Sequence, residues 1–447
     1  MSTELPRVVV AAPASGHGKT TVATGLVAAL TARGLAVSPH KVGPDYIDPG
    51  YHALAAGRAG RNLDPWLVGE HRVAPLMLHG ALVPRPADVA VVEGVMGLHD
   101  GAVGRKDFAS TAHVARLLDA PVLLVLDTTA QGRTAAATVL GLAAFDPRVR
   151  VGGVVLNRVG SARHESLLRE ALAEVGVPVL GAVSRAEQVA TPSRHLGLVP
   201  VAERSPEAIA TVAALAGLVE ATVDLDGVLA LARTAPPLEA EAWDPAAEVG
   251  GETGTQPVVA VAGGAAFSFS YAESEELLAA AGARVVRFDP LHDDALPAGA
   301  RGVVLGGGFP EVHAEALAAN TAMLAQLRDF DGPMHAECAG LLYLCRELDG
   351  HPMVGRIDAT ARMTSALRLG YREAVAPTRT LVAAGGEVVR GHEFHRTATD
   401  PAAGEVPAWS WDGTGHGFTG PRLHASYLHA HWAGTPHAAR RFVEACA

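Results

Sequence analysis

The stretch from 11 to 21, Ala-Ala-Pro-Ala-Ser-Gly-His-Gly-Lys-Thr-Thr, contains the residue types that bind the phosphates of a nucleotide. An apolar run precedes it and an Ala/Leu-rich run follows, so we expect a strand, a glycine loop and a helix in that order. In such a loop backbone N–H groups surround the phosphates, Lys19 contacts the β- and γ-phosphates, and the Thr20 hydroxyl binds Mg²⁺. A proline replaces the first glycine of the usual pattern, and a Gly-rich turn with a coincidental Lys-Thr pair is the alternative. The predicted nucleotide-binding residues are Ser15, Gly16, His17, Gly18, Lys19, Thr20 and Thr21.

Two acidic positions after other apolar runs are candidates for the Mg²⁺ that accompanies a nucleotide. Glu93 ends the run 89–92 and is followed by three glycines, which let the backbone approach a ligand closely. Asp48 lies in a loop of Pro and Gly turns after the second apolar run. A carboxylate at a strand end opposite a phosphate loop binds Mg²⁺ or its water ligands. We predict Thr20, Asp48 and Glu93 as metal ligands; a strand-capping carboxylate and an ordinary polar loop are the alternatives.

Charged and aromatic side chains near these positions could bind an acidic substrate. Arg58 and Arg61 follow the loop, and an arginine pairs with a carboxylate through two parallel hydrogen bonds. A helix-capping salt bridge is the alternative for both. Asn157, after a later apolar run, is a candidate contact to a base or ribose, or a turn former. The predicted substrate-binding residues are Lys41, Asp45, Tyr46, Arg58, Arg61 and Asp100.

Cys338 has the surroundings of a nucleophile. A short apolar run leads to it and Ala-Gly and a helical run follow, which predicts a tight strand-to-helix turn that exposes the thiol. The glycine turn 306–308, after another strand-like run, could direct backbone N–H groups into an oxyanion hole. Inert packing is the alternative for a buried cysteine, and we expect packing for Cys345. For Cys446, near the end of the sequence, no residue pattern indicates a partner.

A cysteine nucleophile needs a base, usually histidine, that the fold brings near. The candidates are the His-Glu-Phe-His stretch at 392–395 and the late pair His429 and His431. The run 423–431 predicts one strand, which would put His429 and His431 on the same face.

Apolar, β-branched runs alternate with Ala/Leu-rich helical stretches from residue 7 to about 200, which predicts an α/β fold with a doubly wound, mainly parallel sheet. Ligands of such sheets bind at the carboxyl ends of the strands, where the acidic positions above fall. A Pro-, Glu- and Gly-rich stretch then predicts an exposed linker, and strand-like runs resume at 258. We predict domains at 1–234 and 257–447 joined by a linker at 235–256.

Composition limits the function classes. The 447 residues are 49% hydrophobic and 19% charged, which is typical of a globular chain of two or more domains. The net charge of −11 argues against a nucleic-acid partner. Three cysteines without paired spacing indicate reduced thiols and a cytoplasmic protein. We expect no membrane partner, because no apolar run is long enough to span a bilayer and no signal peptide is recognisable.

The order and spacing of these stretches resemble the family of cobyrinic and hydrogenobyrinic acid a,c-diamide synthases. The first half is similar to dethiobiotin synthetase-type P-loop ATPases. The second half resembles the cobyric-acid type of class I glutamine amidotransferase domain, also an α/β fold. The resemblance covers nearly the whole chain, and its matching stretches are 12–21, 41–51, 61–66, 93–101, 306–311, 337–340, 391–395 and 425–431.

The resemblance implies a ligase that uses ATP·Mg²⁺ to phosphorylate a substrate carboxylate and glutamine to supply ammonia. Cys338 would attack glutamine with His429 as its base, because His429 occupies the histidine position of the family pattern. Gly307 and Gly308 would donate the oxyanion-hole hydrogen bonds. Many class I amidotransferases complete a triad with His-x-Glu, whereas this sequence has a histidine, His431, at the acidic position. Either a dyad suffices, or another carboxylate orients the base.

The partners implied by the resemblance are ATP, L-glutamine, and cobyrinic or hydrogenobyrinic acid, with a homodimer as a possible assembly. One alternative function is an amidoligase that acts on another tetrapyrrole. The other is a regulatory P-loop ATPase whose C-terminal domain is not catalytic.

Overall fold

The computed structural model describes residues 2–447 except 188, 190–192, 195–196, 199 and 204. The chain divides into two compact units. The N-terminal unit combines Met1–Pro65 with Gly69–Trp243, and the C-terminal unit combines Trp66–Val68 with Asp244–Ala447. In the described part of the chain, no helix has both the length and the apolar character needed to cross a membrane.

The N-terminal unit is built on a seven-stranded sheet whose neighbouring strands are all parallel. Residues of the central strands are buried, as expected for a sheet covered on both faces. This confirms the doubly wound sheet predicted from the alternating runs. In spatial order the strands are β4 (Arg61–Leu63), β3 (Val37–Val42), β5 (Val89–Glu93), β2 (Arg7–Ala11), β6 (Val122–Asp127), β7 (Val151–Val159) and β8 (Val179–Ser184).

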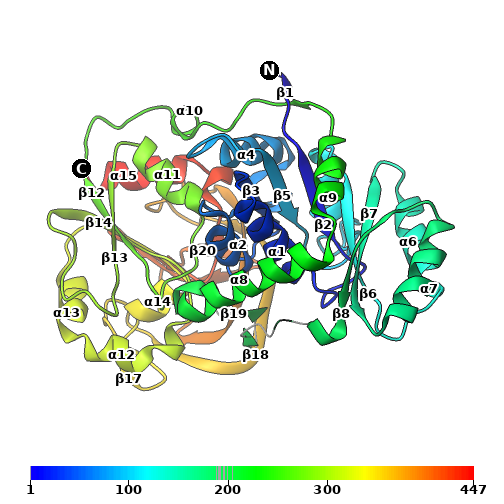
Figure 1. The fold of residues 1–447 in the computed structure, drawn as a ribbon. Coiled ribbons are helices and arrows are strands. Elements are labelled where there is room, and N and C mark those ends of the chain that lie inside the picture. Colours follow the sequence, from blue (N-terminus) through cyan, green and yellow to red (C-terminus); the bar gives the residue numbers. More distant parts are fainter. Residues whose placement is uncertain (1, 188, 190–192, 195–196, 199, 204) are drawn as a thin grey trace. The chain divides into compact units, whose positions relative to one another are not determined.

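Two groups of helices cover this sheet (Figure 1). Strand–helix–strand connections between parallel strands are right-handed, so connections toward β4 and connections toward β8 place their helices on opposite faces. The first group is α1 (Lys19–Ala32) and α2 (Asp48–Ala56), with α8 (Ser205–Thr222) packed against both. The second is α4 (Glu70–Leu82), α5 (Thr111–Leu117), α6 (Thr134–Phe145) and α7 (Ala162–Ala173). The short α3 (Pro65–Val68) precedes α4, and α9 (Leu225–Arg233) follows α8.

The stretch 235–256, expected to be an exposed linker, contains ordered and partly buried structure. Strand β11 (Leu238–Glu239) pairs with β1 (Ser2–Thr3), and Trp243 is buried in the N-terminal unit. Helix α10 (Pro245–Val249) opens the C-terminal unit and is capped by the Asp244 carboxylate, which accepts a hydrogen bond from Ala246 N. The composition that suggested a linker therefore belongs to a segment that packs on the two units at its ends.

The first sheet of the C-terminal unit has six strands, five parallel and one antiparallel at the edge. Their order is β13 (Arg284–Phe288), β12 (Val258–Ala262), β14 (Ala300–Leu305), β15 (Met334–Glu337), β23 (Leu423–Ser426) and β22 (Phe418–Gly420). A buried core that includes Leu305, Met334 and Leu341 lies against it. The helices of this unit are α11 (Ala272–Ala280), α12 (Ala314–Ala319), α13 (Thr321–Asp329), α14 (Ala339–Leu344) and α15 (His437–Ala445).

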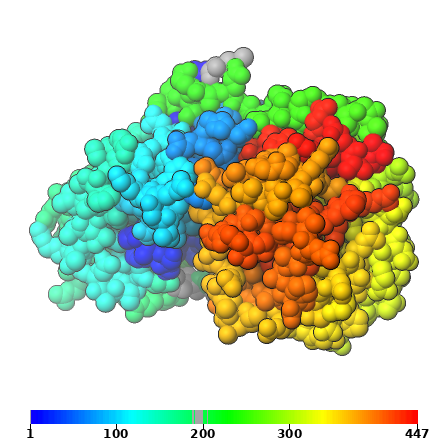
Figure 2. Space-filling model, turned by 180° about the vertical axis from the view of Figure 1, so that it is seen from behind, coloured from blue at the N-terminus to red at the C-terminus, as the bar shows by residue number. Residues whose placement is uncertain are grey.

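A second sheet of the C-terminal unit is centred on the antiparallel strands β18 (Thr360–Val375) and β19 (Val388–Asp400). Residues of this region, orange in Figure 2, cover much of the face of the unit seen there. The other strands of this sheet are β16 (Glu347–Leu348), β17 (His351–Pro352), β20 (Trp409–Trp411), β21 (Thr414–His416) and β24 (His429–Ala430).

The strand predicted over 423–431 is wrong in its extent. Strand β23 ends at Ser426 and pairs with β15 in the first sheet, whereas β24 begins at His429 and pairs with β19 in the second. A 3₁₀ helix starts at Trp432. The chain changes sheets between Ser426 and His429, which no period-2 pattern in the sequence reveals.

Candidate active sites

The predicted phosphate loop lies between β2 and the first residue of α1, Lys19. Gly16 and Gly18 have φ values of 82° and 95°, a left-handed conformation that favours glycine. Lys19 Nζ donates hydrogen bonds to the carbonyls of Ala14 (3.2 Å) and Met96 (2.5 Å). Burial and the neighbouring charge of Lys41 lower the pKa of Lys19 to about 8. The loop therefore has the strand–loop–helix context that its sequence predicted.

Asn157 supports this loop from the end of β7. Its Nδ2 donates to the carbonyl of His17 (2.8 Å), and its Oδ1 accepts from Arg158 N (2.9 Å). A Cβ on Gly18 would lie 2.2 Å from the same Nδ2. The side chain is 1% exposed and is occupied with the loop backbone, which argues against the base or ribose contact considered from the sequence.

The three predicted metal ligands meet at the carboxyl ends of the strands. Thr20 Oγ1 lies 2.6 Å from Glu93 Oε1 and 3.3 Å from Asp48 Oδ2. Lys41 Nζ is 2.7 Å from Asp48 Oδ2 and 2.9 Å from Glu93 Oε1, so its charge balances both carboxylates. Burial raises the pKa of Glu93, but Lys41 and His52 outweigh burial and the pKa is lowered, so the carboxylate stays ionised.

A magnesium ion fits these residues only together with the nucleotide. Within the described residues, no three His, Cys, Asp or Glu side chains form a group that could hold a metal alone. Mg²⁺ in nucleotide sites is commonly bound by one or two carboxylates, a hydroxyl, water and the phosphates. Thr20, Asp48 and Glu93 supply that incomplete set of oxygen ligands.

His52 is a functional candidate that the sequence reasoning missed. Its Nε2 lies 2.7 Å from Glu93 Oε2, and both side chains are almost fully buried. His52 follows Asp48 by four residues on α2, so the two side chains lie on the same face of the helix. The i,i+4 spacing of Asp48 and His52 in the sequence was the signal that could have identified His52.

The predicted substrate residues are in different environments. Arg58 is 8% exposed, and its guanidinium donates to the carbonyls of Gly80 in α4 and of Arg85 in the segment after α4, which argues against its predicted substrate role. Lys41 belongs to the carboxylate cluster. Asp45 Oδ1 accepts hydrogen bonds from the amides of Ile47 and Asp48 and so shapes the loop.

The other three predicted substrate residues lie at or near strand ends of the same sheet. Asp100 is exposed, and its Oδ2 accepts from Gly97 N (3.0 Å). Tyr46 is half-buried in the loop after β3, and Arg61 is buried in β4. Their substrate roles remain predictions.

Cys338 sits on the strand-to-helix turn that its sequence predicted, but its side chain is buried and not exposed as expected. It follows β15 directly and precedes α14, with φ 47° and ψ −98°, a strained conformation for a residue with a side chain. Its N–H donates to Ser426 O at 2.8 Å. A Cβ on Gly340 would lie 2.4 Å from Leu305 O, so the turn needs glycine there to approach β14. This is the geometry of a nucleophile elbow.

His429 lies beside Cys338 and beside the glycine turn. A Cβ on Gly307 would lie 2.5 Å from His429 Cε1. Burial lowers the pKa of His429, but its interactions with Cys338 and Glu337 outweigh burial and raise it to about 10. A raised imidazole pKa favours a thiolate–imidazolium pair, the reactive state of a cysteine nucleophile.

The predicted oxyanion hole needs a correction at Gly307. The Gly307 N–H donates to Phe269 O (3.1 Å) in an isolated β-bridge, so it is not available to an oxyanion. Among the described residues, the Gly308 N–H has no hydrogen-bond acceptor and remains a candidate. The residue after a nucleophile often supplies the second donor, which here is Ala339, the first residue of α14.

Comparisons with known proteins identify the domain that contains each site. Residues 8–199 match the CobQ/CobB/MinD/ParA nucleotide binding domain, and residues 258–437 match the CobB/CobQ-like glutamine amidotransferase domain. The chain is 56% identical to the hydrogenobyrinate a,c-diamide synthase of Streptomyces coelicolor, covering 99% of this chain and 98% of the relative. It is 59% identical to the enzyme of that name from Thermobifida fusca, covering 99% and 97%.

The chain belongs to the a,c-diamide synthase family. A cobyrinate a,c-diamide synthase of Synechococcus sp. is a further relative, 42% identical over 98% of each chain. As a member of this family, the chain is an enzyme with a P-loop nucleotide-binding domain and a glutamine amidotransferase domain. The family resemblance and fold class expected from the sequence are confirmed.

The other two cysteines and two of the histidines considered as bases, His395 and His431, have other environments in this family member. Cys345 and Cys446 are buried, and burial raises the pKa of each to about 12, so both thiols stay protonated. His395 stacks on Tyr427 with 3.7 Å between ring centroids. His431, expected on the same strand face as His429, instead lies 3.7 Å from Glu273.

Proposed function

We propose that this chain amidates the a- and c-carboxylates of hydrogenobyrinate, using ATP and glutamine, in cobalamin biosynthesis. The observation that carries the proposal is full-length similarity to synthases of that name, together with a phosphate loop and a cysteine elbow in one chain. The relatives named for hydrogenobyrinate are 51–59% identical, and those named for cobyrinate are 39–45% identical. This difference favours the substrate without cobalt.

In the glutaminase reaction, the Cys338 thiolate attacks the side-chain amide carbon of glutamine. The tetrahedral oxyanion accepts hydrogen bonds from the Gly308 and Ala339 N–H groups. His429 gives its proton to the leaving nitrogen, so ammonia departs and a glutamyl thioester remains. Water, deprotonated by His429, then hydrolyses the thioester to glutamate and the free thiol.

In the ligase reaction, the γ-phosphoryl group of ATP passes to a substrate carboxylate and gives an acyl phosphate and ADP. Ammonia attacks the acyl carbon, phosphate leaves, and the amide remains. Lys19 and the loop amides bind the phosphates. Thr20, Asp48 and Glu93 would hold Mg²⁺, which neutralises phosphate charge when bound. His52 and Lys41 keep Glu93 ionised and oriented.

Mass spectrometry of the product tests this proposal. The purified protein is incubated with ATP, Mg²⁺, glutamine and either hydrogenobyrinic or cobyrinic acid. We expect two successive replacements of a carboxyl O–H by NH₂, faster with the cobalt-free acid. Faster conversion of cobyrinic acid would reverse the substrate assignment. Glutamine hydrolysis with no change in either acid would favour an amidoligase for another tetrapyrrole.

Three further properties remain predictions from the sequence. They are a cytoplasmic location, the absence of nucleic-acid and membrane partners, and a homodimeric assembly.

A further inference from the structure

The base His429 has a carboxylate neighbour that the sequence did not identify. Glu337, the residue before the nucleophile, places Oε2 3.6 Å from His429 Nδ1. Its Oε1 lies 3.4 Å from the N–H of Ala430, the residue after the base. One carboxylate thus contacts both the ring and the backbone of β24.

We propose that Glu337 is the carboxylate that orients the glutaminase base, His429, and stabilises its protonated form. With Nδ1 directed at Glu337, the ring leaves Nε2 for the Cys338 thiol. The negative charge of Glu337 stabilises the imidazolium that forms when Cys338 loses its proton. This inference rests on the proposed glutaminase roles of Cys338 and His429. Glu337 acts through His429, so it is a positioning residue.

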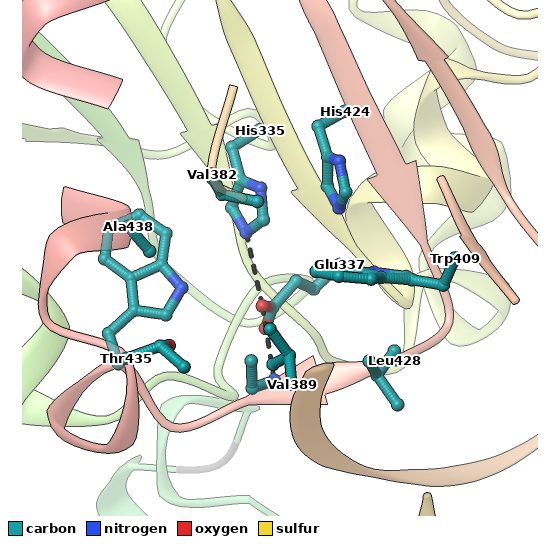
Figure 3. Close-up of a pocket in the computed structure, with 11 residues that line it drawn as sticks. His335, Glu337, Val382, Val389, Trp409, His424, Leu428, Thr435 and Ala438 are labelled. Carbon is teal, nitrogen blue, oxygen red and sulfur yellow. Dashed lines mark hydrogen bonds and ion pairs between the residues drawn. The ribbon is translucent and has the colours of Figure 1, made fainter. Parts of the chain in front are cut away.

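His335 also contacts Glu337, as the dashed line between the two side chains in Figure 3 shows. A carboxylate only accepts, so His335 Nε2 donates to Glu337 Oε1 at 3.2 Å. The His335 ring stacks on His424 and is tilted against Trp432. The cavity beside Glu337, also lined by His335 and His424, has a volume of about 10 Å³, which is the lower limit for holding one water molecule. The Glu337 side chain is 14% exposed, and the side chains around it contribute to balancing its charge.

The charges around the pair agree with this role. Burial raises the pKa of Glu337, but the hydrogen bond with His335 and the interactions with His335 and His429 outweigh burial and lower it to about 2. On the β19 side, His392 stacks on His429 with 5.0 Å between ring centroids, and burial keeps its pKa well below the usual value. Burial does the same for His424. Neither neutral ring competes with His429 for the charge of Glu337.

The acidic position of the family pattern has a different environment here. His431, two residues after the base, stacks on Tyr271 and lies 3.7 Å from Glu273 Oε2. Glu273 is fully buried, as part of α11. The C-terminal unit therefore contains a second Glu–His pair, whose histidine is two residues from His429 and whose carboxylate belongs to α11. Glu273 provides a matched control.

The test compares Glu337→Gln with Glu273→Gln in the full-length protein. Glutamine hydrolysis is measured across pH, and thermal unfolding monitors folding. We expect Glu337→Gln to lower kcat for glutamine about 10²-fold with little change in KM. The alkaline limb of its pH profile should move down by about one to three pH units, because removing a negative charge beside His429 lowers the imidazole pKa. Glu273→Gln should keep both properties of the unchanged protein.

Three outcomes would overturn the inference. They are an unchanged kcat in Glu337→Gln, a lowered kcat with an unmoved alkaline limb, and an equal effect of Glu273→Gln. Glu337→Asp keeps the charge on a shorter side chain, so it should retain the alkaline limb even where kcat falls. If Glu337→Gln does not fold, a displaced limb in Glu337→Asp would count against the charge role.

This test separates the inference from the proposed corrinoid substrate, because glutamine hydrolysis is followed without a corrinoid. If the unchanged protein makes no diamide from glutamine or from ammonia, the substrate proposal fails and the Glu337 comparison still stands. If it hydrolyses no glutamine, the inference fails.

Discussion

Asn157 Nδ2 donates a 2.8 Å hydrogen bond to the carbonyl of His17 and so fixes the phosphate loop to the end of β7. Replacing Asn157 with Ala removes this bond and leaves the loop backbone less ordered. We expect KM for ATP to rise about tenfold, equivalent to about 1.4 kcal/mol, with glutamine hydrolysis unchanged. Steady-state kinetics with ammonia as nitrogen donor measure the effect. An unchanged KM would mean that the loop keeps its shape without Asn157.

Glu93→Gln should separate the two reactions. Glu93 contacts Thr20, Lys41 and His52, so loss of its charge weakens the magnesium site and frees the Lys41 ammonium. We expect ATP turnover to fall at least about 10²-fold, while glutaminase activity persists. Coupled assays of ADP and glutamate release follow the two reactions. Full ATP turnover would show that Glu93 is not part of the ATP site.

Cys338→Ala should abolish the use of glutamine without abolishing synthesis. The variant removes the sulfur that forms the thioester, but it leaves the phosphate loop and the carboxylate cluster intact. At high ammonium concentration and alkaline pH, diamide formation should continue at near the unchanged rate. Product mass with each nitrogen donor checks this. Equal loss with glutamine and ammonia would contradict the division between the two sites.

Gly307→Ala should impair glutamine hydrolysis because the new methyl group collides with the His429 ring. Loss of an oxyanion-hole donor is not the cause. The new Cβ would lie 2.5 Å from His429 Cε1, and the N–H is already bonded to Phe269 O. We expect kcat for glutamine to fall about tenfold or more as the ring moves, since a displacement of about 1 Å can cost 10²-fold. Gly420→Ala is the control, because its Cβ meets no atom within 4 Å.

The phosphate-loop lysine predicts a pH dependence. Burial and the charge of Lys41 lower the pKa of Lys19 to about 8, so the free enzyme loses this positive charge as pH rises through 8. The protonated form binds phosphate, so kcat/KM for ATP should fall above pH 8. Lys19→Arg, which stays charged, should show no fall in that range. Measurements use saturating ammonia, so that the glutaminase does not contribute.

Features defined by neighbouring residues were predictable from the sequence. The phosphate loop and the cysteine elbow are each one strand, one turn and one helix, and their glycines mark the close approaches. The meeting of Thr20 with Glu93 was also predictable, because carboxyl ends of parallel strands share one edge of a sheet.

Features that depend on packing between distant segments were not predictable. The donor assigned to Gly307 is taken by Phe269, through a single bridge that has no sequence signal. Arg58 had the right chemistry for an acidic substrate, but its guanidinium donates a hydrogen bond to a backbone carbonyl of α4. The pairing of Glu337 with His429 depends on the break between β23 and β24, where the chain leaves one sheet for another.

This change of sheet links the nucleophile and its base to different parts of the C-terminal unit. Cys338 follows β15 of the parallel sheet, while His429 opens β24, which is held by β19 of the antiparallel sheet. The reactivity of the thiol is therefore a chemical reporter of how the two sheets are docked. Alkylation of Cys338 by iodoacetamide at neutral pH should slow when the β18–β19 hairpin loosens, before the parallel sheet itself unfolds.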